Sequence, residues 1–110
     1  MINAAVNDVD ETFAVLAEPA RRLVVELLSV RPMRAGEIAE RVGMSRPAMS
    51  RHLRLLRESG LVEVDSSDQD ARARTYRLSA ARLVALQAWL DQVRTYWSAQ
   101  LASFKRHAER

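Results

Sequence analysis

Several features common in proteins are missing from this sequence of 110 residues. It contains no cysteine, which excludes disulfide bonds, cysteine-based zinc sites and cysteine nucleophiles. It contains no run of about 18 apolar residues, so we expect no transmembrane helix and no membrane partner. The acidic N-terminus lacks the basic region and apolar stretch of a signal peptide. These absences predict a soluble protein of the cytoplasm.

Glycine is also scarce, since only Gly36, Gly43 and Gly60 are present. Each lies near the end of an expected helix, so none remains for a loop that cradles phosphate groups. Of the two histidines, His52 lies on the inward side of an expected helix and His107 lies near the terminus. No catalytic set can be assembled from these residues. We therefore expect no enzyme, no catalytic residue and no cofactor.

What the sequence does contain is an uneven distribution of charge. Its composition, 48% apolar and 28% charged, is that of a globular chain, and its length predicts a single domain over residues 1–110. Residues 1–18 carry four acidic side chains and no basic one, whereas residues 45–57 carry four arginines and no acid. The net charge of +3 alone leaves the partner open, but this block of arginines indicates a polyanion.

Apolar residues at three- and four-residue steps predict a first helix within residues 1–17 and a second that ends before Pro32. Pro19 separates the two, because proline disfavours helical geometry in the residue before it. A short third helix is expected at 35–42, with Gly43 in the left-handed position after its last turn.

Ser45 is a good N-cap for a fourth helix, which the sequence places within residues 45–59. The apolar period then changes from about 3.6 to 2, which predicts a two-stranded hairpin over 61–79 with a long polar tip. A last helix over 80–108 would be about 42 Å long, too long for so small a domain to cover alone.

The order of helix, turn, helix and hairpin is that of a winged helix-turn-helix. We therefore predict a mainly α fold with a small β-hairpin, consisting of about five helices and a two-stranded wing. Within the single domain, the helix-turn-helix occupies 35–59 and the wing hairpin 61–79. Segments 1–17 and 80–108 are predicted to form N-terminal and C-terminal dimerisation helices.

One arc of the fourth helix has the composition of a surface that reads a DNA groove. Arginine can donate two hydrogen bonds to guanine, and serine can bond to bases or phosphates. These exposed arginines can also be merely solvated, and periodicity alone does not separate DNA from RNA or from an acidic protein. Near the helix N-terminus arginines reach deepest into a groove, whereas Arg54 and Arg57 are expected at backbone phosphates. The arc contains Arg46, Pro47, Ser50, Arg51 and Arg54.

A stripe of leucine and aromatic residues on the last helix, continued on the first helix, predicts a homodimer. The alternative is a pocket for an apolar small-molecule effector between these two helices, and both can coexist. A third possibility is that no small ligand exists and that abundance or a protein partner sets activity. The predicted dimer interface consists of Val9, Phe13, Leu86, Trp89, Leu90, Val93, Trp97, Leu101 and Phe104.

The run GEIAERVGMSRPAMSRHLRLLRESGLV, followed by a charged loop and TYRLS, closely resembles the ArsR/SmtB family of bacterial winged-helix repressors. The resemblance covers roughly Phe13 to Leu83 and includes LAEPARRLVVELL, a version of the family's opening helix. It implies a homodimeric, DNA-binding transcriptional repressor that a signal releases from its operator. The hairpin matches the family's wing, with Arg72 and Arg74 as candidates for the minor groove or flanking phosphates. The positions that match the family's recognition helix are Ser45, Arg46, Pro47, Ser50 and Arg51.

Two departures from the family pattern bear on function. The wing tip carries Asp68 and Asp70 beside its two arginines, which leaves the tip nearly neutral and its contribution to DNA binding in doubt. Founding members of the family sense metals through cysteines near the third helix, where this chain has Arg34 and Gly36. They also use carboxylates and histidines of the last helix, where this chain offers only Asp91, His107 and Glu109.

Asp91 and His107 lie about 24 Å apart on one helix, so they could meet only across a dimer. We therefore expect no metal site. His52 is expected to be a hydrogen-bonded structural residue. The sequence thus predicts a sequence-specific transcriptional regulator that binds an inverted repeat of double-stranded DNA through residues 45–59. The alternative is a winged-helix module for protein–protein contact or for non-specific nucleic-acid binding.

Overall fold

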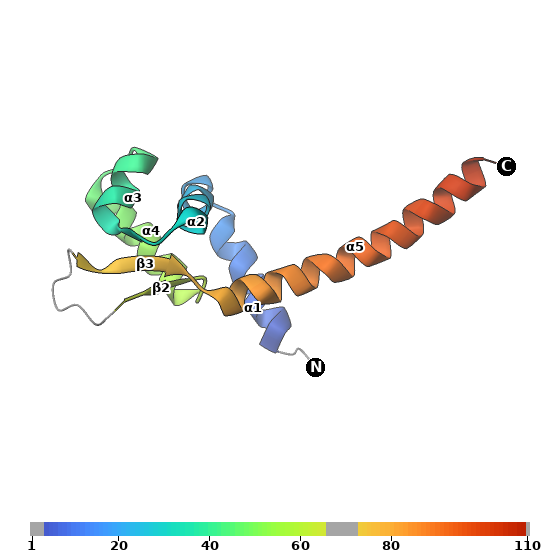
Figure 1. Ribbon diagram of the computed structural model, residues 1–110, viewed down its shortest axis with the longest axis horizontal. Helices are drawn as coiled ribbons and strands as arrows, with labels where there is room; N and C mark the ends of the chain where they lie inside the picture. Colours follow the sequence, from blue (N-terminus) through green and yellow to red (C-terminus); the bar gives the residue numbers. More distant parts are fainter. Residues whose placement is uncertain (1–3, 66–72, 110) are drawn as a thin grey trace.

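The computed structural model describes residues 4–65 and 73–109 (Figure 1). This part of the chain forms five helices and three short strands. In chain order the elements are α1 (Ala4–Leu16), α2 (Pro19–Val30), β1 (Met33–Arg34), α3 (Ala35–Val42), α4 (Arg46–Glu58), β2 (Val62–Val64), β3 (Thr75–Leu78) and α5 (Ala80–Ala108). The predicted mainly helical fold class is confirmed, and all five expected helices are present.

The predicted two-stranded hairpin is present as β2 and β3, and a third strand, β1, which the sequence does not predict, joins it. β3 lies in the middle and pairs antiparallel with both β2 and β1. The additional strand pairs Met33 with Tyr76 and Arg34 with Thr75. A strand of two residues has no period to detect, and its partner lies far along the chain, so local sequence gives no signal for it.

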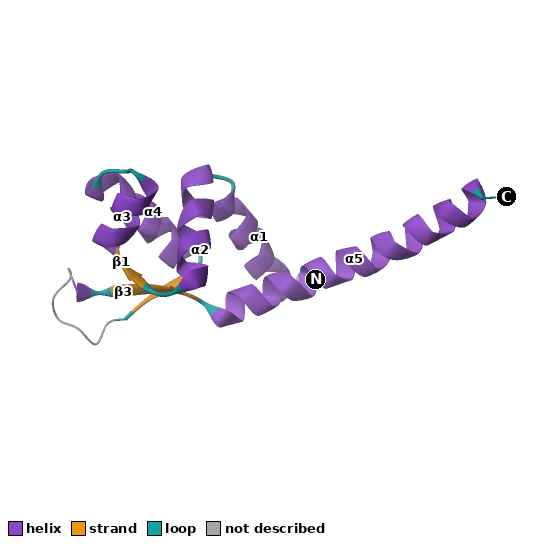
Figure 2. Cartoon of the chain, turned by 45° about the horizontal axis from the view of Figure 1, so that its top comes forward, coloured by secondary structure: helices purple, strands orange, loops and turns teal. Residues whose placement is uncertain are grey.

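We call the unit formed by α2, α3, α4 and the three strands the head, and one apolar core holds it together. Each helix contributes the apolar side of an amphipathic pattern, and the sheet closes the core from below α2 in Figure 2. Burying such side chains stabilises a domain by roughly 1.5–3 kcal/mol each. The core residues with 0% or 1% exposure are Val24, Ile38, Met49, Leu53, Leu56 and Leu61.

α1 packs on the beginning of α5, and both polar and aromatic contacts join them. Arg82 of α5 forms an ion pair with Asp8 and lies 3.7 Å from a carboxylate oxygen of Glu11. The rings of Phe13 and Trp89 meet edge to face, with centroids 5.1 Å apart. The acidic first helix therefore has part of its charge neutralised within the chain.

Val9 corrects part of the predicted dimer interface. It is only 3% exposed in the single chain, because α1 packs on the rest of the protomer, so it offers no surface to a second copy. A helical stripe identifies apolar residues but does not say which neighbour covers them.

α5 extends well beyond the head (Figures 1 and 2). The radius of gyration is 18.0 Å, compared with about 13 Å for a compact chain of this length. None of the 29 residues of α5 is buried. Among the described helices, none combines the length and hydrophobicity that crossing a membrane requires.

Candidate nucleic-acid interface

A tight turn fixes α3 against α4. Gly43 has φ +79°, and its N–H donates to the carbonyl oxygen of Ala39 at 3.0 Å, as does that of Met44 at 2.9 Å. This left-handed ending favours glycine, since other residues are strained there. Ser45 then caps α4, accepting a hydrogen bond from the N–H of Ala48 at 3.3 Å. The turn therefore ends α3 and starts α4 with three residues between the two helices.

α4 separates a buried face from an exposed basic face. Met49, Leu53 and Leu56 are buried in the core of the head. Their spacing of four and three residues places them on one side of the helix. The opposite side presents the residues predicted to contact DNA, all of them exposed: Ser45, Arg46, Pro47, Ser50, Arg51 and Arg54, with Arg57 in the next turn.

The arginines of α4 have no acidic partner in the described chain, whereas five arginines outside α4 do. Arg31 and Arg41 bond to Glu37, Arg77 to Glu63, Arg82 to Asp8 and Arg94 to Asp91. Within residues 4–65 and 73–109, no ion pair or side-chain hydrogen bond involves Arg46, Arg51, Arg54 or Arg57. Their charge is therefore available to a polyanion.

Arg46 of α4 approaches the third helix at Gly36. Its Nη1 is 3.1 Å from the position that a Cβ on Gly36 would occupy. Gly36 thus leaves the space in which this guanidinium crosses α3. Nothing in the local sequence pattern indicates this contact between Gly36 and Arg46.

The wing is only partly described. Arg74 is half-buried before β3, whereas Arg72, Asp68 and Asp70 lie outside the described residues. Across the hairpin Glu63 pairs with Arg77, whose Nη2 is 3.2 Å from the carboxylate. The predicted DNA contact of Arg74 stays a prediction.

Glu37 anchors the segment before α3. Hydrogen bonding by the Arg31 guanidinium is the largest influence that lowers the pKa of the Glu37 carboxyl, and Arg41 adds to it at 3.0 Å. The same hydrogen bond raises the pKa of Arg31. A carboxylate in the first turn of a helix is also favoured by the helix dipole. These contacts tie the end of α2 to the start of α3.

His52 is half-buried and hydrogen-bonded, as expected for a structural histidine. Its Nδ1 lies 3.1 Å from Nη1 of Arg21, and Nε of Arg21 donates to the carbonyl oxygen of Val15 at 2.6 Å. Since a guanidinium can only donate, Nδ1 of His52 is the acceptor in this hydrogen bond. Arg21 thereby joins the end of α1 to the middle of α4, a role that no sequence signal indicated.

The metal-ligand candidates of the last helix are not brought together. In the described part of the chain, no three histidine or carboxylate side chains gather closely enough to hold a metal ion.

The predicted dimer residues on α5 form a row that begins beside α1 and continues along the part of the helix that extends beyond the head (Figure 1). Leu86 and Val93 are half-buried, and the others become more exposed toward the C-terminus. Phe13 of α1 joins them at the head end of the row through its contact with Trp89. The exposed fractions are 36% for Trp89, 48% for Leu90, 57% for Trp97, 59% for Leu101 and 72% for Phe104.

Comparison with known proteins identifies the family. The profile described as "Bacterial regulatory protein, arsR family" matches residues 18–64, which span the head from α2 to β2. The HTH-type transcriptional regulator Rv2034 of Mycobacterium tuberculosis is 35% identical over 96 residues, covering 86% of this chain and 83% of that protein. The chain belongs to the ArsR family. It is therefore a DNA-binding transcriptional regulator, and the resemblance inferred from the sequence is confirmed.

Solved structures of ArsR-type proteins share the fold. The transcriptional repressor BigR from Xylella fastidiosa has a TM-score of 0.60 and 32% identity, covering 74% of this chain and 79% of its own. The homodimeric winged helix-turn-helix DNA-binding domain Mb0332 from Mycobacterium bovis has a TM-score of 0.64 and 26% identity, covering 84% and 82%. In this chain α3, the turn at Gly43 and α4 follow one another in the order predicted for the helix-turn-helix, and β2 and β3 pair antiparallel where the wing hairpin is predicted. Members of the family are transcription regulators, which are not enzymes.

Proposed function

We propose that the protein is a homodimeric repressor that binds an inverted-repeat operator in the cytoplasm through the exposed face of α4. In this proposal the residues that contact DNA are Ser45, Arg46, Pro47, Ser50, Arg51 and Arg54, with Arg72 and Arg74 from the wing. Occupancy of the operator would block transcription. Regulation would not use a metal at the positions where founding members of the family bind one.

The observation that carries this proposal is the exposed basic face of α4 opposite its buried face. Three arginines and two serines are exposed on it, and its guanidinium groups are not neutralised by the described residues. A DNA groove supplies both the phosphates that attract this charge and the base edges that arginine can read.

The dimer is supported by the uncovered apolar row of α5 and by the homodimeric state of the Mb0332 domain. Pairing of α1 and α5 across a two-fold axis would present two copies of α4 to the same side of the duplex. Two recognition helices about 34 Å apart, one turn of DNA, would then meet successive major grooves. Each protomer reads one half of the inverted repeat.

A fluorescence anisotropy titration tests this function. The probe is a labelled duplex from upstream of the protein's own gene, measured beside a scrambled duplex at several salt concentrations. We expect the upstream duplex to bind at least about 10³-fold more tightly. Equal and weak binding of both duplexes with a steep salt dependence would instead indicate that only phosphates are contacted.

Arg51→Ala is the first variant to test. We expect it to reduce the preference for the operator by about 5- to 150-fold, the equivalent of about 1–3 kcal/mol, because a base contact is lost. Arg106→Ala removes the same charge from the far end of α5 and should leave the preference within about twofold. If Arg51→Ala binds every duplex as the unmodified protein does, α4 does not read DNA.

A further inference from the structure

A groove lies between α1 and the second half of α4, and Glu58 at its edge also borders Arg54 and Arg57 of the exposed basic face. Its volume is about 330 Å³, within the range of small-molecule sites. Phe13 and Val15 are two residues apart and so point to nearly opposite sides of α1. The groove therefore lies off the side of α1 that carries Phe13. The residues that line it are Glu11, Ala14, Val15, Arg21, Leu55, Glu58 and Ser59.

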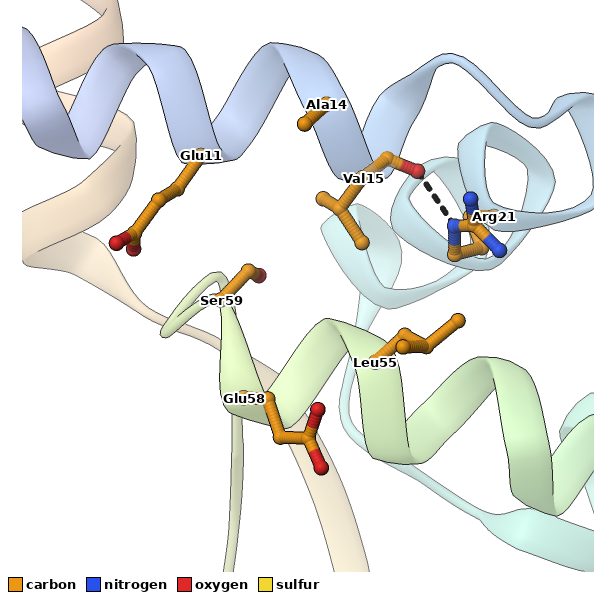
Figure 3. A pocket seen from close by; sticks show the side chains of 7 residues that line it. All are labelled: Glu11, Ala14, Val15, Arg21, Leu55, Glu58 and Ser59. Atoms are coloured by element: carbon orange, nitrogen blue, oxygen red, sulfur yellow. Dashed lines mark hydrogen bonds between the residues drawn. The ribbon is translucent and has the colours of Figure 1, made fainter.

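The two ends of the groove differ in chemistry (Figure 3). Val15 and Leu55 face each other across its middle, with Glu11, Glu58 and Ser59 toward one end and Arg21 at the other. Leu55 is 37% exposed, although it belongs to the apolar pattern of α4. The groove thus combines an apolar middle with an acidic end.

The charged side chains of the groove differ in how many hydrogen bonds and ion pairs they already form. Arg21 uses Nε on the carbonyl oxygen of Val15 and Nη1 on His52. Glu11 has a contact of 3.7 Å to Arg82. Glu58 forms no ion pair or side-chain hydrogen bond with the described residues. Of the two carboxylates, that of Glu58 is therefore the one available to pair with a cation, although Arg54 and Arg57 line a neighbouring hollow with it.

Both walls of the groove matter for DNA binding in the proposed repressor. One wall is α1, which leads to the proposed dimer interface, and the other is α4, which carries the proposed DNA-contacting arginines. Arg21 lines the groove and bonds to both walls, at Val15 and at His52. A molecule bound between these walls would therefore change the distance between α1 and α4.

We propose that this groove is an effector site for a small molecule with an apolar body and a cationic amine, and that its occupation lowers the affinity for DNA. The apolar body would lie between Val15 and Leu55, and the amine would pair with Glu58. The regulatory step rests on the proposed function, whereas binding itself does not. A ligand that favours one placement of α4 shifts the population toward it.

The test uses three probes with one skeleton: 4-phenylbutylamine, 4-phenyl-1-butanol and 4-phenylbutanoate. Each is titrated at constant ionic strength into the full-length ¹⁵N-labelled protein and followed by amide chemical shifts. We expect the shifts at Ala14, Val15, Leu55, Glu58 and Ser59. The amine should bind about two- to fivefold more tightly than the alcohol, as an exposed ion pair allows, and the acid should bind most weakly.

Two variants locate the binding. Glu58→Gln should abolish the advantage of the amine over the alcohol, whereas Glu40→Gln, which removes an exposed carboxylate of α3, should preserve it. Leu55→Trp should fill the groove and abolish shifts with all three probes. Thermal melting of each variant confirms that it is folded.

The proposal is overturned if the probes shift amides elsewhere in the chain, if none binds, or if the acid binds more tightly than the amine. A second readout is DNA anisotropy, in which saturating amine should weaken operator binding at least about fivefold, the low end of allosteric coupling. Leu55→Trp should lose this response. Amine binding without an effect on DNA affinity overturns the regulatory step. Failure of the free protein to prefer its operator contradicts the proposed function and leaves the NMR result standing.

Discussion

α4 and α5 are both amphipathic helices, but they differ in where their apolar side goes. α4 has 13 residues and buries Met49, Leu53 and Leu56 in the head. α5 has 29 residues and buries none, although it carries Trp89, Trp97 and other large apolar side chains. The apolar side of α4 is thus covered within one chain, whereas that of α5 needs a second chain to cover it.

This difference means that the stability of the fold and the association of two chains depend on different parts of the sequence. All core residues of the head precede residue 79, so the head has its own core without most of α5. A contiguous apolar row of this length is rare on monomeric proteins and marks an interaction surface. Changes in the head should therefore alter folding, and changes in the second half of α5 should alter association.

The largest effect is expected from ending the chain after Ala88. This removes most of the apolar row while retaining the core of the head, so we expect a folded monomer. Operator affinity should fall by about 10²-fold or more, because two linked half-sites gain at least that factor over one. Analytical ultracentrifugation and circular dichroism measure the two properties. A truncated protein that remained dimeric would contradict the proposed arrangement.

Leucine-to-alanine changes in the head and in α5 should have different effects on the free energy of unfolding. Leu53 is 1% exposed, so Leu53→Ala should lower the free energy of unfolding by about 2–5 kcal/mol through a cavity in the head. Leu101 is 59% exposed in the single chain, so Leu101→Ala should change unfolding by less than about 0.5 kcal/mol at concentrations where the protein is monomeric. Urea denaturation at low protein concentration measures both. Equal losses would contradict the separation of head and α5.

Ser45 and Ser79 offer a smaller test, because each caps the start of one of the two helices. Each hydroxyl accepts a hydrogen bond of 3.3 Å from a backbone N–H three residues on, at Ala48 and Arg82. Ser45→Ala should lower the free energy of unfolding by about 1 kcal/mol, as loss of an N-cap does. Ser79 is 4% exposed and lies between the head and α5, so Ser79→Ala should cost at least as much. Thermal denaturation of the two variants checks this order.

The smallest effect concerns pH and is confined to the head. The pKa of Glu37 is lowered in the folded protein by the Arg31 hydrogen bond. Its contribution to stability is therefore present above the ordinary glutamate pKa of about 4.3 and is lost as pH falls through the lowered value. Glu37→Gln should reduce the loss of stability between pH 7 and pH 3, and Glu40→Gln should not. Denaturation curves at several pH values distinguish the two.

Local patterns predicted much of the head and the face of α4. Gly43 and Ser45 have sequence signatures that depend only on neighbouring residues, and the structure places both at helix ends. The separation of Arg51 from Leu53 around α4 follows from helical geometry alone. These features could be predicted because each depends on residues within a few positions.

The features that sequence did not reveal all join distant parts of the chain. Strand β1 exists because Met33 reaches Tyr76, and Arg21 meets His52 across 31 positions. The sequence shows that the first helix is acidic, but its pairing with Arg82 depends on how α1 crosses α5. Spacing along one helix cannot specify the side chain that a second helix brings to it.

The uncovered length of α5 has a consequence for gene dosage. A long helix with no buried residue has little to hold it in an isolated chain, so its order depends on finding a second copy. At low abundance the concentration of paired chains rises with the square of the number of chains made. Operator occupancy would then respond to expression level more steeply than in proportion, and a regulator that limits its own synthesis would settle within a narrow range of abundance.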